Sequence, residues 1–577
     1  MILAKPENIE AFTAEGWWGT STIDDMFRAR VSELGDTEAV IDPINRDAIF
    51  GGEPRRLSWN ALADEVARMA GVLYGLGLRK DDAVLMQLPN SVEQYVAYLG
   101  CARLGIIVSP VPAQYREHEI RFVLSQAQAK AAICTARIGK FAHAQMMLGL
   151  QAQSDELRHV LCFGEAVPDG AIALDQAMAE CADADVAAAE SYAQGAGITA
   201  NDIFSLTWTS GTESNPKGVP RSANDWLIAG QSVVEAPGLK AGQRSLNPFP
   251  MVNHAGIASS FSAWLQAGLT VVQHHPFDLK VFLEQIRTEV IEYTVAPPAI
   301  LNMLLQQPQL LEGIRFDKLR YIGSGSAPLS EWMISEFDKR YGVKVHNMFG
   351  SSEGMCMPGT DRDIPDPALR AAYFPRLGVA GFEWDAPCTR KIVTRLVDPE
   401  TEQEITAPGV PGEMRIKGPT VISEYWRAPE QTAKSFDDQG YYKTGDTFEI
   451  AGERNQYYKY AGRSKDLVIR GGMNISPDEI ESLLQAHPKV REVSVVGWPD
   501  ARLGELVCVC VAPKAGETLT LEDLVAYLRD EKRVASFKLP ERILLVDELP
   551  RNPVGKVLKR KLREQVQSLS DASTQKG

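Results

Sequence analysis

One segment, residues 209–219, limits the fold of this chain more than any other feature. It reads Thr-Ser-Gly-Thr-Glu-Ser-Asn-Pro-Lys-Gly-Val and follows residues 203–208, an apolar, β-branched run typical of a strand entering a sheet. Residues 224–235, beyond it, are predicted to form a helix. Backbone N–H groups, hydroxyls and an ammonium can together bind phosphate oxygens. A plain surface loop is the common interpretation of a Ser/Thr/Gly run, but a run that ends in Pro-Lys-Gly favours phosphate binding.

Two common phosphate-binding motifs are excluded by residue order. A Walker A loop needs Gly-Lys followed by Ser or Thr at the start of a helix, whereas Lys217 precedes its glycine and a valine follows. A dinucleotide fingerprint beginning at Gly323 and Gly325 needs a third glycine where Pro328 stands. The segment therefore indicates a phosphate site of another kind.

Predicted helices and strands alternate from about residue 57 to residue 354, which indicates parallel βαβ units and an α/β fold. Two more strands end in Gly/Ser-rich segments, residues 323–328 and 348–354. Ligands of open α/β sheets bind at the carboxyl ends of the strands, so these segments and residues 209–219 are predicted to share one site. Residues 165–200, rich in Ala, Asp and Glu, are expected to form a peripheral insertion or loop region.

Composition argues against several other classes of protein. The formal net charge is −15, whereas nucleic-acid-binding proteins usually have a basic excess. The eight cysteines show no zinc spacing and fit a reducing, cytoplasmic compartment. Residues 1–20 lack the apolar core of a signal peptide, and no apolar run is long enough for a transmembrane helix. The polar residues 568–577 are expected to form a disordered tail.

The chain changes character after about residue 375. Residues 375–464 are rich in proline and glycine with short strands, which predicts a small β-rich subdomain. Beyond a polar joint, residues 465–577 are predicted to form a compact α/β unit, in which Cys508 and Cys510 share one face of a strand. We therefore place the domain boundary at Lys465, between an N-terminal domain of residues 1–464 and a C-terminal lid domain of residues 465–577.

Residues 209–219 closely resemble the nucleotide-binding signature of the adenylate-forming superfamily, which comprises acyl-CoA synthetases, firefly luciferase and the adenylation domains of peptide synthetases. The other signatures occur in the family's order, so the resemblance covers nearly the whole chain. Residues 349–353 are similar to the motif Tyr-Gly-x-Thr-Glu, with Phe and Ser at its first and fourth positions. Residues 444–446 and 462–466 match the family's ribose-binding turn and Gly-Arg-Ser-Lys-Asp joint, and Lys556 matches its C-terminal catalytic lysine.

The resemblance implies a role for each matched residue. The implied catalytic residues are Lys556, Glu353, Ser352 and Lys217. The implied ATP and AMP site comprises Thr209, Ser210, Gly211, Thr212, Lys217, Gly325, Ser326, Ala327, Pro328, Phe349, Gly350, Ser351, Ser352, Asp446 and Arg463. Glu353 and Thr212 would hold Mg²⁺, Lys465 would be the hinge of a domain alternation, and Gly471 and Gly472 would line the CoA channel. Taken alone, an isolated glutamate, a turn aspartate or a loop lysine is more often a solvated or structural group.

The resemblance implies an acyl pocket lined by Asn253, His254, Gly323, Gly325, Met348 and Met355. Either His254 or Asn253 could gate the carboxylate site, because the family's Pro-x-x-His pattern is one residue longer here, and a core histidine is the alternative. Small and methionine side chains would suit a hydrophobic acid, and fatty, alicyclic, aryl and steroid-side-chain acids stay open.

The activity that the resemblance implies is an ATP-dependent carboxylic acid–CoA ligase with ATP, Mg²⁺ and CoA. A carboxylate and ATP would give acyl-AMP and pyrophosphate, and CoA would then take the acyl group and release AMP. Three alternatives are a ligase that loads a carrier protein, an inactive acyl-adenylate-binding homologue, and a luciferase-type enzyme, for which no luciferin pocket is evident. The resemblance is also compatible with a homodimer.

Overall fold

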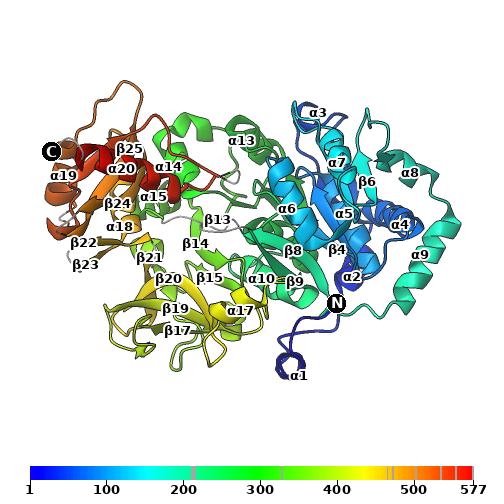
Figure 1. Cartoon of the computed structure of the whole chain (residues 1–577), viewed down its shortest axis with the longest axis horizontal. Coiled ribbons are helices and arrows are strands. Elements are labelled where there is room, and N and C mark those ends of the chain that lie inside the picture. The colour runs from blue at the N-terminus through cyan, green and yellow to red at the C-terminus, as the bar shows by residue number, and fades with distance from the viewer. Residues whose placement is uncertain are drawn as a thin grey trace.

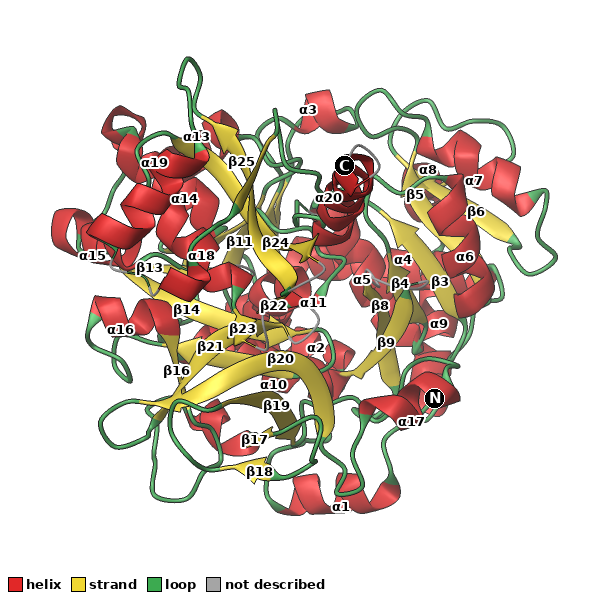
Figure 2. Ribbon diagram, turned by 60° about the vertical axis from the view of Figure 1, so that its left-hand side comes forward, coloured by secondary structure: helices red, strands yellow, loops and turns green. Residues whose placement is uncertain are grey.

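The computed structural model describes residues 1–209, 216–325, 329–463, 466–470, 473–500, 503–532, 534, 536–552 and 555–574. These residues form sheets of seven, eight, six and five strands. In Figure 1 the N-terminal elements lie on the right in blue and cyan, the six-stranded sheet lies at the bottom in yellow, and the C-terminal elements lie at the upper left in orange and red. The prediction of an α/β fold is confirmed (Figure 2).

The seven-stranded sheet is parallel except at one edge. Its strands, in spatial order, are β7 (Ile172–Ala173), β6 (His159–Phe163), β5 (Ala129–Thr135), β3 (Ala83–Gln87), β4 (Ile107–Pro110), β8 (Ile203–Thr209) and β9 (Lys217–Ser222). β8 and β9 form an antiparallel hairpin in which Thr209 lies opposite Lys217. β9 was not predicted, because Gly218 and Pro220 weaken the strand pattern. The strand forms because β8 supplies hydrogen-bond partners for its backbone.

The eight-stranded sheet is parallel except at its two edges. Its strands, in spatial order, are β15 (Met355–Gly359), β14 (Lys344–Ser351), β13 (Tyr321–Gly325), β12 (Tyr293–Val295), β10 (Arg244–Asn247), β11 (Thr270–Gln273), β1 (Glu38–Ile41) and β2 (Arg56–Ser58). β14 does not open into a loop after residue 347, as the sequence suggested, but continues to Ser351 and turns back into β15. The glycine and serine residues of this motif therefore lie in a strand pair.

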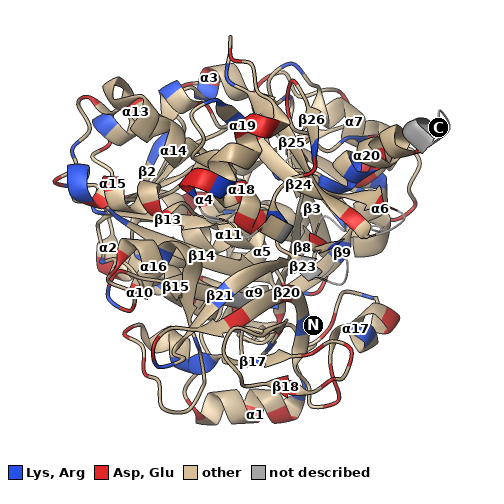
Figure 3. Cartoon of the chain, turned by 90° about the vertical axis from the view of Figure 1, so that its left-hand side faces the viewer, with Lys and Arg blue, Asp and Glu red and all other residues tan. Residues whose placement is uncertain are grey.

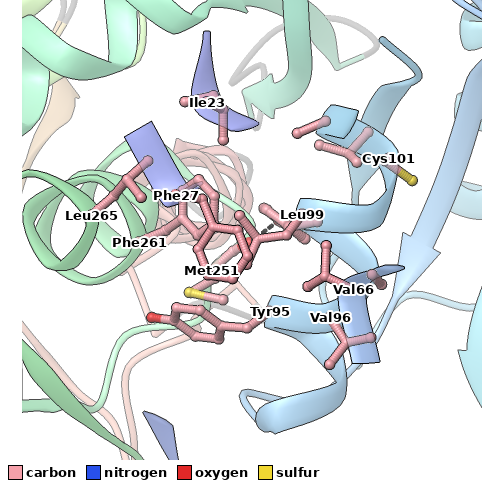
Figure 4. Close-up of a cluster of buried hydrophobic side chains, with 14 of the residues drawn as sticks. Ile23, Phe27, Val66, Tyr95, Val96, Leu99, Cys101, Met251, Phe261 and Leu265 are labelled. Carbon is pink, nitrogen blue, oxygen red and sulfur yellow. Dashed lines mark hydrogen bonds between the residues drawn. The ribbon is translucent and has the colours of Figure 1, made fainter. Parts of the chain in front are cut away.

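Helices pack between these two sheets and form the main core. They are α2 (Ile23–Leu34), α4 (Trp59–Gly75), α5 (Val92–Leu104), α10 (Ala223–Glu235), the π-helix η1 (Ile257–Ser262) and α12 (Ala263–Ala267). Ser58, a residue type that favours helix starts, caps α4: its hydroxyl accepts from the Ala61 N–H at 3.2 Å. Figure 4 shows Phe27, Tyr95 and Phe261 meeting in this core, from α2, α5 and η1.

The six-stranded sheet is antiparallel throughout. Its strands, in spatial order, are β16 (Tyr373–Pro375), β21 (Tyr457–Arg463), β20 (Tyr442–Ala451), β19 (Pro411–Lys417), β17 (Val393–Val397) and β18 (Glu404–Ile405). The five-stranded sheet contains β22 (Val468–Arg470), β23 (Met473–Ile475), β24 (Val490–Asp500), β25 (Gly504–Pro513) and β26 (Arg542–Leu545).

Three helices accompany the five-stranded sheet: α18 (Pro477–Gln485), α19 (Leu521–Ala526) and α20 (Lys559–Thr574). Cys508 and Cys510 lie on one face of β25, as predicted, and pack with Leu562 and Val566 of α20. The expectation of a disordered tail from residue 568 is wrong, because α20 continues to Thr574. The apolar residues that hold α20 on the sheet lie in its first half, so the helix extends its backbone hydrogen bonds through the polar end.

Peripheral helices complete the fold. Residues 165–200, expected to be a peripheral insertion or loop region, contain α8 (Leu174–Glu180) and α9 (Asp183–Gly195), so only the loop alternative is wrong; α9 packs on α4 and buries Ala189. Alanine has the highest helix propensity, and the many alanines of this segment explain why it forms helices. The others are α1 (Pro6–Ala14), α3 (Arg46–Ile49), α6 (Glu117–Ala127), α7 (His143–Gln151), α11 (His254–Gly256), α13 (Leu279–Thr288), α14 (Pro298–Gln306), α15 (Glu331–Tyr341), α16 (Pro367–Ala372) and α17 (Pro429–Ser435).

Positions of basic and acidic residues are interspersed along the ribbon in the view of Figure 3. Within the described part of the chain, no helix has the length and apolar character needed to cross a bilayer.

Candidate active site

The carboxyl ends of β8, β13 and β14 meet at one cavity of about 770 Å³. The six-stranded sheet, Asn552 and Lys556 also contribute to its walls. The predicted site residues that line it are Thr209, Lys217, Asn253, His254, Gly323, Gly325, Met348, Phe349, Gly350, Ser351, Ser352, Glu353, Asp446 and Lys556. Residues from six separate stretches of the sequence are thus brought to one cavity.

The remaining predicted site residues cannot be placed in full. Nine of them lie outside the described residues: Ser210, Gly211, Thr212, Ser326, Ala327, Pro328, Lys465, Gly471 and Gly472. The side chains of Met355 and Arg463 are likewise outside the described part. The backbone of Arg463 lies opposite Asp446 across the β20–β21 pair, so the two residues come from neighbouring strands.

A hairpin and an aromatic ring hold Lys217 at the cavity. Thr209 ends β8 and Lys217 begins β9, and the two residues lie opposite each other. Both ends of the predicted phosphate loop therefore reach the cavity. The Lys217 ammonium lies 5.0 Å from the centroid of the Tyr425 ring, a distance at which the ring face attracts a cation.

One phenol bonds the Glu353 carboxylate, and a second phenol bonds the first. The Tyr425 hydroxyl donates to Glu353 Oε1 at 2.9 Å and lies 3.0 Å from the Tyr442 hydroxyl. Burial, reinforced by the charge of Glu353, raises the pKa of both phenols, so both stay protonated. The Ile422 N–H donates to the backbone oxygen of Glu353 at 3.0 Å, which also fixes the main chain here.

A buried arginine lies behind the Ser352–Glu353 segment. Arg221, on β9, is fully buried, and its guanidinium donates to the backbone oxygens of Ser352 and Thr420. The nearest carboxylate is that of Asp225, 3.8 Å from the guanidinium. Burial lowers the pKa of Arg221, because the charged guanidinium is less stable away from water than in it.

Contacts with Thr420 also restrict the backbone at Gly354. The Thr420 hydroxyl donates to the Gly354 oxygen, and φ at Gly354 is 128°, a region that side chains strongly disfavour. A Cβ atom at this position would also collide with the Thr420 oxygen. Glycine is therefore required where β14 turns back into β15.

His254 has polar atoms that the protein itself does not use. Among the described residues, neither ring nitrogen has a hydrogen-bond partner, although both nitrogens are buried. The ring stacks on Trp226, with centroids 5.4 Å apart. Burial, aided by the charge of Arg221, lowers the pKa of His254 to about 3, so the imidazole is neutral. Asn253, by contrast, uses its side-chain oxygen to accept from the Gly256 N–H at 2.9 Å.

Lys556 reaches the cavity on a turn that carries its own hydrogen bonds. The Lys556 N–H donates to Asn552 Oδ1, and the Asn552 N–H donates to the Lys556 oxygen, each at 2.8 Å. Both residues line the cavity. The chain therefore brings a second lysine to a hollow that already contains Lys217, from more than three hundred residues away.

Phe349 packs in an aromatic cluster rather than standing alone. Its ring centroid lies 5.1–5.6 Å from those of Phe374, Phe448 and Tyr460. One part of Phe349 still lines the cavity. The cluster fixes the ring orientation through packing alone, so a tyrosine hydroxyl is not needed to hold it.

Within the described residues, no three His, Cys, Asp or Glu side chains gather as a metal-ligand group. A magnesium ion does not require such a group, because it is usually bound by one or two carboxylates together with substrate phosphates and water. Glu353 supplies one carboxylate at the cavity, so the residues present fit this ion.

Residues 27–426 match the family model described as AMP-binding enzyme, and residues 479–556 match the model of its C-terminal domain. The chain belongs to the AMP-binding enzyme family. It is 29% identical over 564 residues to the medium-chain fatty-acid–CoA ligase of Escherichia coli (strain K12), covering 96% of this chain and 92% of that protein. It is 32% identical over 538 residues to the indoleacetate–CoA ligase of Aromatoleum aromaticum, covering 93% and 98%.

Among solved structures, ATP-bound MatB from Rhodopseudomonas palustris superposes with a TM-score of 0.76 at 28% identity, covering 95% of this chain and all of that one. The similarity extends over both matched regions. The fold of this AMP-binding enzyme is therefore that of adenylate-forming enzymes.

Several residues at the cavity of this AMP-binding enzyme escaped the sequence analysis. Tyr425, Tyr442 and Asn552 lie in short segments without a marked pattern, so nothing in the sequence pointed to them. Arg221 carried a signal that could have been used: it is a charged residue inside the short apolar run that follows Lys217. A charge in such a place needs internal partners.

Proposed function

We propose that this AMP-binding enzyme is an AMP-forming carboxylic acid–CoA ligase. The observation that carries the proposal is that Lys217, Glu353, Asp446 and Lys556 line one cavity, although they come from four distant stretches of the chain. The curated relatives above are both named CoA ligases, one for a fatty acid and one for an aryl acid.

The reaction would proceed in two steps. A carboxylate oxygen of the acid attacks the α-phosphorus of ATP, the bond to the β-phosphate oxygen breaks, and pyrophosphate leaves. The thiol sulfur of CoA then attacks the acyl carbon, and AMP leaves with the electrons of the broken C–O bond. Adenylation is needed because a carboxylate is a very poor acylating agent, whereas a mixed anhydride carries a good leaving group.

The charged residues would act at the phosphate end of the cavity. Lys217 and Lys556 would bind phosphate oxygens, and the Lys556 ammonium would stabilise the charge that develops as oxygen attacks phosphorus. The Ser352 hydroxyl would donate to the α-phosphate, and Asp446 would accept from the ribose hydroxyls. Glu353 would hold Mg²⁺, which neutralises phosphate charge when bound.

The acyl end of the cavity is supported as an uncharged compartment. Small and apolar residues line it, among them Val233, Ala258 and Val295, and His254 is neutral. A hydrophobic acid fits such a lining better than a dicarboxylate or an amino acid, because a second charge would find no counter-ion there.

The division of labour between two parts of the chain is also a proposal. Residues 1–464 would hold the substrates, and residues 465–577 would act as a lid that turns about Lys465. In its second orientation, Gly471 and Gly472 would line the channel through which CoA enters, because absent side chains let the thiol arm approach the backbone closely.

The eight cysteines are all free thiols, which is consistent with a cytoplasmic location.

A pyrophosphate-release screen tests the proposal. The enzyme is incubated with ATP, Mg²⁺ and a panel of fatty, alicyclic, aryl, amino and dicarboxylic acids, with and without CoA. We expect release with hydrophobic monocarboxylates and acyl-CoA only when CoA is present. Release without any thioester would indicate a different acceptor, and no release with any acid would overturn the ligase proposal.

A further inference from the structure

The floor of the acyl compartment contains one hydroxyl that no described residue bonds. Tyr293, on β12, lines the cavity, and the residue as a whole is only 3% exposed. Its phenolic oxygen makes no hydrogen bond to any described residue, and it is accessible from the cavity rather than sealed in the core. That oxygen lies over Gly323 of the neighbouring strand, where a Cβ atom would come within 2.7 Å of it. The missing side chain at position 323 is what gives the hydroxyl its place on the floor.

Other buried tyrosines of the large α/β part and the six-stranded sheet behave differently. The Tyr95 hydroxyl lies 2.7 Å from Ser260 Oγ, and the Tyr98 hydroxyl donates to the Met251 oxygen at 2.6 Å. Partners are likewise present for Tyr425, Tyr442, Tyr457 and Tyr458. The Tyr293 hydroxyl differs because it faces the cavity, where water can bond it until a ligand displaces that water. A ligand that covers this hydroxyl without offering a partner would leave it buried and unpaired, which is costly.

The surroundings of this hydroxyl require a neutral partner. Burial, with a smaller contribution from the nearby Cys356 thiol, raises the pKa of Tyr293, so the phenol is uncharged and can both donate and accept. The charged lining residues, Lys217, Glu353, Asp446 and Lys556, belong to the phosphate end.

The Cys356 thiol does not substitute for the missing partner. The Ser232 hydroxyl donates to the Cys356 sulfur, 2.8 Å away, and also lies 2.9 Å from the Ala229 oxygen. The sulfur is therefore already paired with Ser232. The remaining neighbours on the cavity wall, Val233 and Val295, have no polar side-chain atom.

The position along the strands sets where on the substrate the partner group lies. β13 reaches the phosphate end at Gly325, and Gly323 lies two residues back, about 7 Å deeper along the sheet. A group over Gly323 is therefore remote from the reacting carboxylate, on the far side of a ring or short chain.

We infer that the acid which this enzyme activates is compact and carries a neutral hydrogen-bonding substituent, such as a hydroxyl or carbonyl oxygen, remote from its carboxylate, and that Tyr293 binds this substituent. The inference rests on the proposed ligase function and narrows its substrate class. A plain alkyl or aryl acid would bury the Tyr293 hydroxyl without a partner, and sites built to bond a substrate hydroxyl discriminate strongly against analogues that lack it.

The test uses matched pairs of acids that differ only in one remote hydroxyl: benzoate, phenylacetate, phenylpropionate and octanoate, each compared with its para- or terminally hydroxylated form. The readout is kcat/KM in pyrophosphate release. For at least one pair we expect the wild-type enzyme to prefer the hydroxylated acid by about tenfold or more, and the Tyr293→Phe variant by less than about threefold. The Tyr293→Phe variant should also be no less stable to heat than the wild type, because the hydroxyl it loses has no partner in the unliganded protein.

Tyr458→Phe is the matched control. Tyr458 is equally buried, but its hydroxyl lies 3.2 Å from Thr394 Oγ1, away from the cavity. This variant should lower the midpoint of thermal unfolding and leave every substrate ratio unchanged. Equal rates for both members of all pairs in the wild type, or a preference that survives in Tyr293→Phe, would overturn the inference while leaving the ligase proposal intact. Failure of the ligase proposal is distinct, because then no acid of the panel releases pyrophosphate.

Discussion

Replacing Arg221 by leucine should weaken both the fold around the cavity and the adenylation step. The guanidinium donates to the backbone oxygens of Ser352 and Thr420, and through them it fixes the segment that ends in Glu353. Leucine fills much of the same space without any donor. Two buried carbonyl oxygens would then lose their partners, and the chain that carries Glu353 would be free to shift.

The expected loss of stability follows from these contacts. Hydrogen bonds from a charged donor contribute about 1.5–3 kcal/mol each, so two of them amount to roughly 3–6 kcal/mol. Burial of the guanidinium itself is unfavourable, as its lowered pKa shows, and leucine avoids this cost. We therefore expect the free energy of unfolding to fall by about 2–4 kcal/mol. A shift of Glu353 by about 1 Å should slow adenylation by roughly 100-fold.

Arg370 provides a matched control for stability. It is also fully buried, and its guanidinium donates to the backbone oxygens of Val345, Ile364 and Pro365, at 3.1, 2.8 and 3.3 Å, but none of these three acceptors lies in the segment that ends in Glu353. The assay combines urea unfolding with single-turnover formation of acyl-AMP at a temperature where all variants are folded. Both leucine variants should unfold more easily, and only Arg221→Leu should slow acyl-AMP formation. Equal slowing in the two variants, or an Arg221→Leu rate within about threefold of wild type, would refute the reasoning.

Four further substitutions have clear expected outcomes. Glu353→Gln should abolish ATP–pyrophosphate exchange, since an amide is a poor ligand for Mg²⁺; exchange within about tenfold of wild type would remove Glu353 from the metal site. Lys556→Ala should cripple acyl-AMP formation yet still convert supplied acyl-AMP to acyl-CoA, whereas Lys465→Pro should do the reverse; equal loss of both steps in both variants would argue against alternation about Lys465. His254→Phe should reduce acid sensitivity, measured by thermal unfolding from pH 7 to pH 5. The folded-state pKa of about 3 lies below the value of 6.5 for an unperturbed histidine, so stability is complete above pH 6.5 and falls as the unfolded chain takes up the proton, by about 2 kcal/mol at pH 5. An unchanged pH profile would show that the ring is solvated.

Much of the fold could be predicted because local signals agreed with burial. The Ser58 cap and the apolar face of Leu62, Val66 and Met69 define α4, and the alternation of helices and strands fixes the parallel sheets. The shared cavity also followed from pattern alone, since the ends of parallel strands lie at one edge of a sheet. These are features in which a few neighbouring residues determine the outcome.

The parts that escaped prediction depend on contacts between distant residues. β9 contains Gly218 and Pro220, which weaken a strand pattern, and it forms because β8 offers it an edge. The roles of Arg221 and Tyr425 exist only where β9, the β14–β15 turn and the segment around residue 420 come together. Sequence periodicity carries no information on contacts between distant segments, so it could not predict the roles of Arg221 and Tyr425.

The turn that carries Lys556 is held together by local hydrogen bonds. The Lys556 N–H donates to Asn552 Oδ1 and the Asn552 N–H donates to the Lys556 oxygen, so both bonds lie within the turn. Three residues further on, the buried ammonium of Lys559 lies 2.9 Å from the Glu481 carboxylate and 3.3 Å from that of Asp478, both on α18. Lys559, three residues from Lys556 in the chain, is thereby held by a helix that accompanies the five-stranded sheet, not by the strands that form the cavity floor. A rotation of that C-terminal unit would withdraw the ammonium from the phosphates once the acyl-AMP has formed, and the same rotation would open the acyl carbon to a thiol.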